Sequence, residues 1–117
     1  MSAFRSVLLV GTGDFSEVCA VLKTHDIGVI TAESFDQAQL MLGQFCVGAV
    51  IAYAPDATVL VRLQRLRTPL VVVSRDLQEP DVACAALLRE LDAASLPRVL
   101  RRVMGGERSE QEKRGAA

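Results

Sequence analysis

The chain has 117 residues, half of them hydrophobic, and its 13 basic and 14 acidic residues almost cancel. This length and composition are typical of one folded domain, and they exclude a largely disordered chain. The balanced charge gives no indication of nucleic-acid binding. Three cysteines without a CxxC pair, and a single histidine, argue against a disulfide framework or a zinc site.

Short apolar segments punctuate the chain and predict five β-strands. In chain order they cover residues 7–10, 27–31, 47–53, 70–74 and, more weakly, 86–88. The first four are rich in valine and isoleucine with little polar alternation, which is typical of strands covered on both faces of a parallel sheet. No apolar run approaches the roughly 20 residues of a membrane helix. We therefore expect a cytoplasmic protein without membrane insertion.

Segments with helical spacing separate the strands. Asp14 with Glu17, and Ser34 with Gln37, predict capping boxes at the starts of the first two helices. The apolar spacing predicts a third helix over 59–66 and a short fourth over 81–85. Ser95, as a cap before a proline in the first turn, predicts the start of a last helix.

This alternation of strand and helix predicts an α/β domain, a doubly wound five-stranded parallel sheet with helices on both faces. We expect the domain to cover residues 1–105. Residues 106–117 are polar and charged without an apolar face, and we interpret them as a flexible tail or linker.

The segment Gly11-Thr12-Gly13 follows the first strand and allows two interpretations. In one it belongs to a G-x-G-x-x-S turn of a nucleotide-binding unit. Gly11 and Gly13 would then hold a pyrophosphate at the start of the first helix, and Glu33, about 20 residues on, would bind the ribose hydroxyls. A lone glycine pattern of this kind is a weak signal.

The other interpretation rests on three longer segments in a particular order. They are HDIGVITAESFDQAQLML (25–42), RTPLVVVSR (67–75) and SLPRVLRRVMGG (95–106). Together they resemble the second strand and helix, the fourth strand and the last helix of the receiver domain of bacterial response regulators. The resemblance covers about residues 5–105 and implies the receiver, or flavodoxin-like, form of the doubly wound sheet.

The resemblance also implies where a phosphorylation site would lie. Receivers take a phosphoryl group on an aspartate after the third strand, with Mg²⁺ held by that residue and an acidic pair after the first strand. A Ser or Thr and a Lys complete the site. In this chain these positions fall on the following residues: Gly11 and Thr12 for the acidic pair, Ala52 or Tyr53 for the acceptor, Ser74, and Arg89 for the Lys.

Only Ser74 matches the family pattern, and residues 49–54 contain no acidic residue. A hard cation requires carboxylate oxygens, and phosphoryl transfer to protein requires a carboxylate nucleophile. The resemblance therefore implies an atypical receiver, or pseudo-receiver, that does not take up phosphate by the family's route. Asp56 lies beyond the window, and we expect it to be a loop or cap residue.

Three side chains near this degenerate site have more than one interpretation. Tyr53 either fills the vacated acidic pocket, with its hydroxyl reaching water or Ser74, or simply packs at a strand end. Ser74 is expected to bond to nearby backbone. Arg89 is either an ordinary surface arginine or a partner for Glu90, Asp56 or an acidic protein.

The last third of the chain carries a candidate interface that combines small apolar residues with an arginine row. Its members are Val82, Ala86, Leu87, Leu91, Arg98, Arg101 and Arg102. Such a patch suits an acidic partner or a second copy of the chain. The arginines of the third helix, Arg62, Arg65 and Arg67, form the competing candidate.

Taken together, these patterns predict a non-enzymatic signalling or regulatory module of the two-component type, without a cofactor or a bound metal. We expect it to act through protein contacts, as a homodimer or with other proteins, and not through nucleic acid. A small nucleotide-binding Rossmann-type regulatory domain is the main alternative, and a receiver phosphorylated by an unusual route is the third.

Overall fold

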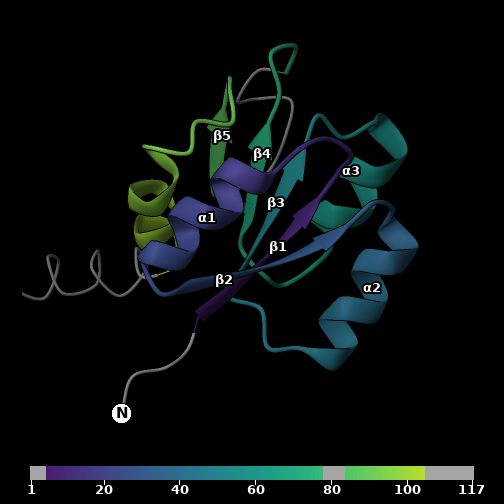
Figure 1. Cartoon of the computed structure of the whole chain (residues 1–117). Helices are drawn as coiled ribbons and strands as arrows, with labels where there is room; N and C mark the ends of the chain where they lie inside the picture. Colours follow the sequence, from purple (N-terminus) through teal and green to yellow (C-terminus); the bar gives the residue numbers. More distant parts are fainter. Residues whose placement is uncertain (1–4, 78–83, 105–117) are drawn as a thin grey trace, which may run out of the picture.

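Parallel strands form a single sheet at the centre of the molecule (Figure 1). The computed structural model describes residues 5–77 and 84–104. Within them the sheet has five strands in the order β2-β1-β3-β4-β5, and every pairing is parallel. The strands are β1 (Arg5–Val10), β2 (Ile27–Ala32), β3 (Ala49–Tyr53), β4 (Leu70–Val73) and β5 (Ala86–Leu88). The predicted doubly wound parallel sheet is confirmed.

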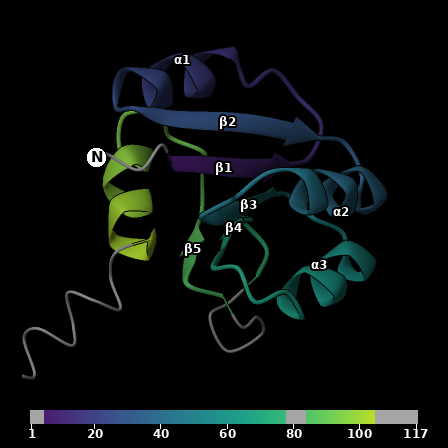
Figure 2. The ribbon, with the colours of Figure 1, turned by 90° about the horizontal axis from the view of Figure 1, so that it is seen from below.

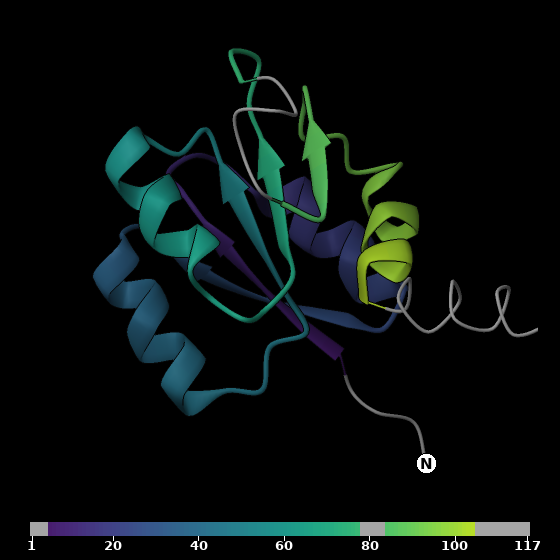
Figure 3. The same ribbon diagram turned by 180° about the vertical axis from the view of Figure 1, so that it is seen from behind.

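Helices cover both faces of this sheet (Figures 2 and 3). α1 (Ser16–Thr24) and the helical residues 96–104 lie on one face, whereas α2 (Phe35–Gln44) and α3 (Ala57–Gln64) lie on the other. In the described parts of the chain, no helix combines the length and apolarity needed to cross a membrane.

The core consists of two layers, one on each side of the sheet. Successive side chains of a strand point to opposite faces, so Val7 and Leu9 pack with α1 and with residues 96–104. Leu8 and Val10 pack with α2 and α3. Because both faces are covered, the strands are mainly apolar, which is the pattern from which they were predicted.

Two helices start at side-chain caps that the sequence predicts. The hydroxyl of Ser34 accepts a hydrogen bond from the Gln37 N–H (3.2 Å) at the start of α2. The Gln37 side chain in turn accepts from the Glu33 N–H (2.8 Å), one residue before the N-cap. Asp56 caps α3 by accepting from the Val59 N–H (2.8 Å), as expected.

The predicted cap of the first helix is wrong, whereas the last helix starts directly after Ser95, as predicted. The N-cap residue of α1 is Phe15, without a side-chain capping bond. Asp14 instead accepts hydrogen bonds from the backbone N–H (3.1 Å) and the hydroxyl of Ser16, because its short side chain reaches the residue two positions on. The hydroxyl of Ser95 donates back to the Asp92 carbonyl (3.4 Å).

Three other expectations fall wholly or partly outside the described residues. They concern Val82, most of the predicted fourth helix at 81–85, and the predicted tail at 106–117. Of that fourth helix, Cys84 and Ala85 are described, and neither is helical. The domain boundary near residue 105 stays a prediction.

Candidate functional site

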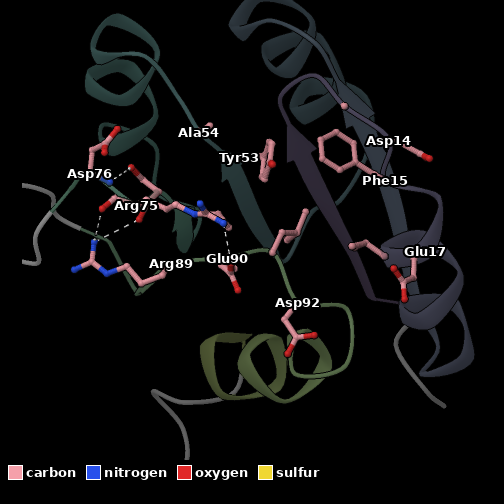
Figure 4. A pocket seen from close by; sticks show the side chains of 15 residues that line it. Asp14, Phe15, Glu17, Tyr53, Ala54, Arg75, Asp76, Arg89, Glu90 and Asp92 are labelled. Atoms are coloured by element: carbon pink, nitrogen blue, oxygen red, sulfur yellow. Dashed lines mark hydrogen bonds and ion pairs between the residues drawn. The ribbon is translucent and has the colours of Figure 1, made fainter.

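A cleft of about 700 Å³ opens at the carboxyl edge of the sheet (Figure 4). Open α/β sheets bind ligands at this edge. The cleft brings together residues that follow β1, β3, β4 and β5, among them Tyr53, Ser74 and Arg89 from the predicted site. Gly11, Thr12 and Ala52 do not line it: Ala52 is fully buried, and Thr12 is exposed on the loop after β1.

Gly11, at the end of β1, lies against Tyr53 of the neighbouring strand β3. A Cβ at Gly11 would stand 3.0 Å from both the Cβ and the carbonyl oxygen of Tyr53, and the φ of Gly11 is +151°. Residues with a side chain rarely adopt this backbone conformation. The end of β1 therefore has neither the backbone geometry nor the space for an acidic side chain at Gly11.

An aromatic pair occupies the wall of the cleft beside this glycine. The rings of Phe15 and Tyr53 meet edge to face, with centroids 5.4 Å apart and an interplanar angle of 79°. This arrangement is a favourable one for two aromatic side chains. The Tyr53 ring lines the cleft, and no hydrogen bond joins its hydroxyl to Ser74. Both interpretations of Tyr53 stay predictions.

Arg89 binds the backbone of the segment that follows β4. Its Nη1 donates to the carbonyl oxygens of Ser74 (3.5 Å), Arg75 (3.3 Å) and Leu77. Arg89 is exposed, as expected of a surface arginine. Its predicted contacts with Glu90 and Asp56 are wrong, because the guanidinium reaches these carbonyl groups instead, and a contact with an acidic protein stays a prediction. Glu90 pairs with Arg75 instead (2.8 Å).

Ser74 bonds to nearby backbone, as predicted. Its Oγ accepts a hydrogen bond from the Asp76 N–H (3.2 Å), and its own N–H donates to the Leu88 carbonyl (2.8 Å). Ser74 therefore links the end of β4 to β5 and to the loop that Arg89 holds.

Carboxylates outnumber cations around the cleft. The acidic lining residues are Asp14, Glu17, Asp76, Glu90 and Asp92, against Arg75 and Arg89. Both arginines are already engaged, with Glu90 and with carbonyl oxygens. The hydrogen bonds from the Ser16 hydroxyl and then from its backbone N–H hold the pKa of Asp14 below its ordinary value, so this carboxylate stays ionised.

The nucleotide-binding alternative is not favoured by this geometry. In the dinucleotide-binding fold the strand order is 3-2-1-4-5-6, whereas here β1 lies between β2 and β3. The carboxylates of Asp14 and Glu17 lie at the start of α1, where a pyrophosphate would have to bind. Gly11 and Gly13 shape the loop after β1, and Glu33 is exposed beyond β2.

No group of three or more His, Cys, Asp or Glu side chains is arranged to hold a metal ion within the parts of the chain that the structure describes. The carboxylates around the cleft thus do not form a cluster of the kind that Mg²⁺ requires. The prediction that the chain binds no metal stays a prediction.

The structure separates the two components of the predicted interface. Ala86, Leu87 and Leu91 are half-buried and pack on the core of their own molecule. Arg98, Arg101 and Arg102 are all exposed on the helical residues 96–104. The Nη2 of Arg101 lies 3.1 Å from the Nδ1 of His25, which ends α1. The exposed part of this surface is therefore the arginine row.

Comparisons with known proteins agree with this architecture. No protein-family model and no curated protein matches the sequence. A response regulator from Thermotoga maritima superposes with a TM-score of 0.76 at 15% identity, covering 88% of this chain and 99% of that one. The chain has the receiver fold. The predicted fold class is thereby confirmed.

Two further receivers give the same result. The receiver domain of an HD domain-containing protein from Pseudomonas fluorescens has a TM-score of 0.74 at 18% identity, and the match covers 92% of this chain and 99% of that one. The receiver domain of a Pseudomonas aeruginosa sensor histidine kinase has a TM-score of 0.70 at 16% identity, covering 88% and 99%. That structure holds a magnesium ion in its active-site cleft. At these identities the comparisons establish the receiver fold of this chain.

Proposed function

We propose that this chain is a receiver-like interaction module in signalling that works without phosphorylation and without catalysis. The receiver fold supports a signalling or regulatory role. The observation that carries the rest is the contact at Gly11. The close approach of Tyr53 occupies the space that an acidic side chain after β1 would need, and β3 ends in alanine and tyrosine.

The chemistry of the cleft supports the same proposal. Phosphoryl transfer to a protein carboxylate needs a free carboxylate nucleophile and neutralisation of the phosphate charge. Asp56, the first carboxylate after β3, is engaged as the cap of α3. Arg89, at the position of the family's Lys, directs its guanidinium to three backbone carbonyl groups.

Treatment with acetyl phosphate, or with beryllofluoride, in the presence of Mg²⁺ tests this proposal. We expect no added phosphoryl mass and no change in the amide resonances of Gly11 and Tyr53. A receiver that contains the acidic residues serves as the positive control. An added phosphoryl group would overturn the proposal, and Asp56→Asn would then show whether Asp56 takes it by an unusual route, since asparagine retains the cap.

We further propose that a partner protein docks on the arginine row of residues 96–104. Arg98, Arg101 and Arg102 are exposed, and they lie on the side of the helix opposite Leu96 and Leu100, which are fully buried in the core. An exposed row of this kind selects an acidic partner and makes its binding sensitive to salt. The half-buried residues Ala86 and Leu91 pack in the same core layer as Leu96 and Leu100 and would support this surface, whereas Leu87 packs on the opposite face of the sheet.

Changing Arg98, Arg101 and Arg102 together to Glu tests the docking surface. We expect unchanged circular dichroism and weaker capture of the partner, with a reduced or reversed salt dependence. The matched control changes Arg62, Arg65 and Arg67 to Glu, which alters the net charge by the same amount. If capture survives the first change and is lost with the control, the docking surface lies on α3.

A further inference from the structure

The end of α3 carries positive charge without any acidic neighbour in sequence. Residues 57–74 contain Arg62, Arg65 and Arg67 and no Asp or Glu. All three arginines, called here the α3 arginine cluster, are exposed, and none forms an ion pair with another described residue. The guanidinium of Arg62 lies 5.3 Å from the centre of the Phe35 ring. Val61, beside them, is 49% exposed.

The cleft carries the opposite charge. Asp14, Glu17 and Asp92 line it without an ion-pair partner among the described residues. Phe15, whose ring meets that of Tyr53, lies between Tyr53 and Asp14, and Glu17 lies farther along on α1, as Figure 4 shows. A guanidinium suits such a lining, because it stacks on aromatic rings and forms charge-assisted hydrogen bonds with carboxylates.

These two surfaces cannot meet within one molecule. α3 follows β3 and precedes β4, so it runs from the carboxyl edge of the parallel sheet back to the amino edge. Arg62 is in its last turn, and Arg65 and Arg67 follow. Arg65 and Arg67 therefore lie toward the amino edge, and Arg62 packs on Phe35 at the start of α2. The cleft opens at the carboxyl edge beside α1, which covers the opposite face of the sheet from α3. A second copy can bring the two surfaces together, and the formal net charge of −1 gives little repulsion between copies.

We propose that the α3 arginine cluster of one copy docks into the cleft of another copy. The arginine side chains contact the carboxylates of Asp14, Glu17 and Asp92, and Val61 packs at the rim. We take the contact to be head-to-tail, with one cleft and one arginine cluster left unoccupied on every pair. In this arrangement further copies add until a ring closes or a filament forms.

Sedimentation velocity across a range of protein concentrations measures this association. At about 0.01 M salt, where charges act over about 30 Å, we expect the weight-average mass to rise with concentration without a plateau at the dimer. At about 1 M salt, where that distance is about 3 Å, the association constant should be at least roughly 10-fold lower. A chain that stays monomeric at low salt, or stops at a dimer, would contradict the proposal.

Two complementary variants test which surfaces meet. The first changes Arg62, Arg65 and Arg67 to Gln, and the second carries Asp14→Asn, Glu17→Gln and Asp92→Asn. The asparagines keep the oxygen atoms that accept the hydrogen bonds from Ser16 and Ala94. We expect each variant alone to be monomeric, while an equal mixture forms dimers that grow no further, since one intact surface of each kind remains.

A charge-matched control separates this contact from the docking surface proposed above. Changing Arg98, Arg101 and Arg102 to Gln alters the net charge as much as the first variant does, and it should leave self-association unchanged. A mixture that stays monomeric, or a control that abolishes association, overturns the head-to-tail contact. Partner capture is measured separately, so the two proposals can fail independently.

Discussion

Gly11 is the residue on which the geometry of the cleft depends most directly. Its φ is positive, and it lies in contact with Tyr53. The ends of β1 and β3 can therefore lie side by side, with the Tyr53 side chain at the cleft. The glycine is thus part of the packing as well as of the turn.

We expect Gly11→Ala to destabilise the fold. The added methyl group meets the Tyr53 backbone at 3.0 Å in a conformation that alanine rarely adopts, which should lower the free energy of unfolding by about 1–3 kcal/mol. Gly43→Ala is the matched control, because Gly43 is helical with open space around it. It should raise the free energy of unfolding by about 0.5–1 kcal/mol. Urea unfolding of both variants checks this, and equal midpoints would contradict the account.

For single residues of the site, the sequence predicted the local hydrogen bonds but not the contacts between distant parts of the chain. Ser74 and Asp56 behave as expected, because both bonds are local and depend on sequence neighbours. The partners of Arg89 and the Phe15–Tyr53 contact were missed. Arg89 reaches carbonyl groups at least 12 residues away in sequence, and no spacing rule predicts such a contact.

At the scale of elements, the described part of the segment after β4 is held by the Arg89 guanidinium and by the Ser74–Asp76 hydrogen bond. Arg89 gathers three carbonyl groups that would otherwise face solvent. The Arg75–Glu90 ion pair spans the same region, but its side chains are 76% and 69% exposed. Ion pairs with this exposure contribute about 0–1 kcal/mol.

We therefore expect Arg89→Ala to loosen this segment and Arg75→Ala to leave it almost unchanged. In the first variant, hydrogen exchange at the Asp76 amide should be about five-fold faster, corresponding to about 1 kcal/mol. Native-state exchange followed by NMR measures both variants. Equal acceleration in the two would show that the ion pair matters as much as the carbonyl contacts.

The strands were predicted closely and the helix starts only in part. Ser34 and Asp56 act as caps because their side chains reach an N–H three positions on. Asp14 has the same chemistry, but the Ser16 hydroxyl lies nearer and competes for its carboxylate. Which of two local hydrogen bonds forms depends on the backbone of the loop, and the sequence pattern does not specify that.

At the scale of the whole molecule, the strand order decides between the two interpretations of the glycine segment. The apolar strands predicted a doubly wound sheet under either interpretation. The position of β1 between β2 and β3 is a property of the folded chain. The resemblance to receivers over residues 25–42, 67–75 and 95–106 indicated this order, whereas composition and spacing alone left the choice open.

We expect no saturable binding of NAD, ATP or cyclic dinucleotides. The carboxylates of Asp14 and Glu17 at the start of α1 repel a phosphate group, and the Asp14 carboxylate already binds the Ser16 N–H. Isothermal titration calorimetry at sub-millimolar nucleotide checks this. A micromolar dissociation constant that is abolished by Glu33→Ala would restore the nucleotide-binding interpretation.

The same strand order has a consequence for how the chain folds during synthesis. β1 pairs with both β2 and β3, so three adjacent strands of the sheet can pair once β3 has emerged. β4 then pairs with β3, and β5 with β4. Each later strand therefore pairs with the strand made just before it. The chain segment that must be closed for each pairing is then short. Since chains fold from the N-terminus as they are made, we expect the sheet to grow from one edge on the ribosome, without opening a pairing already formed.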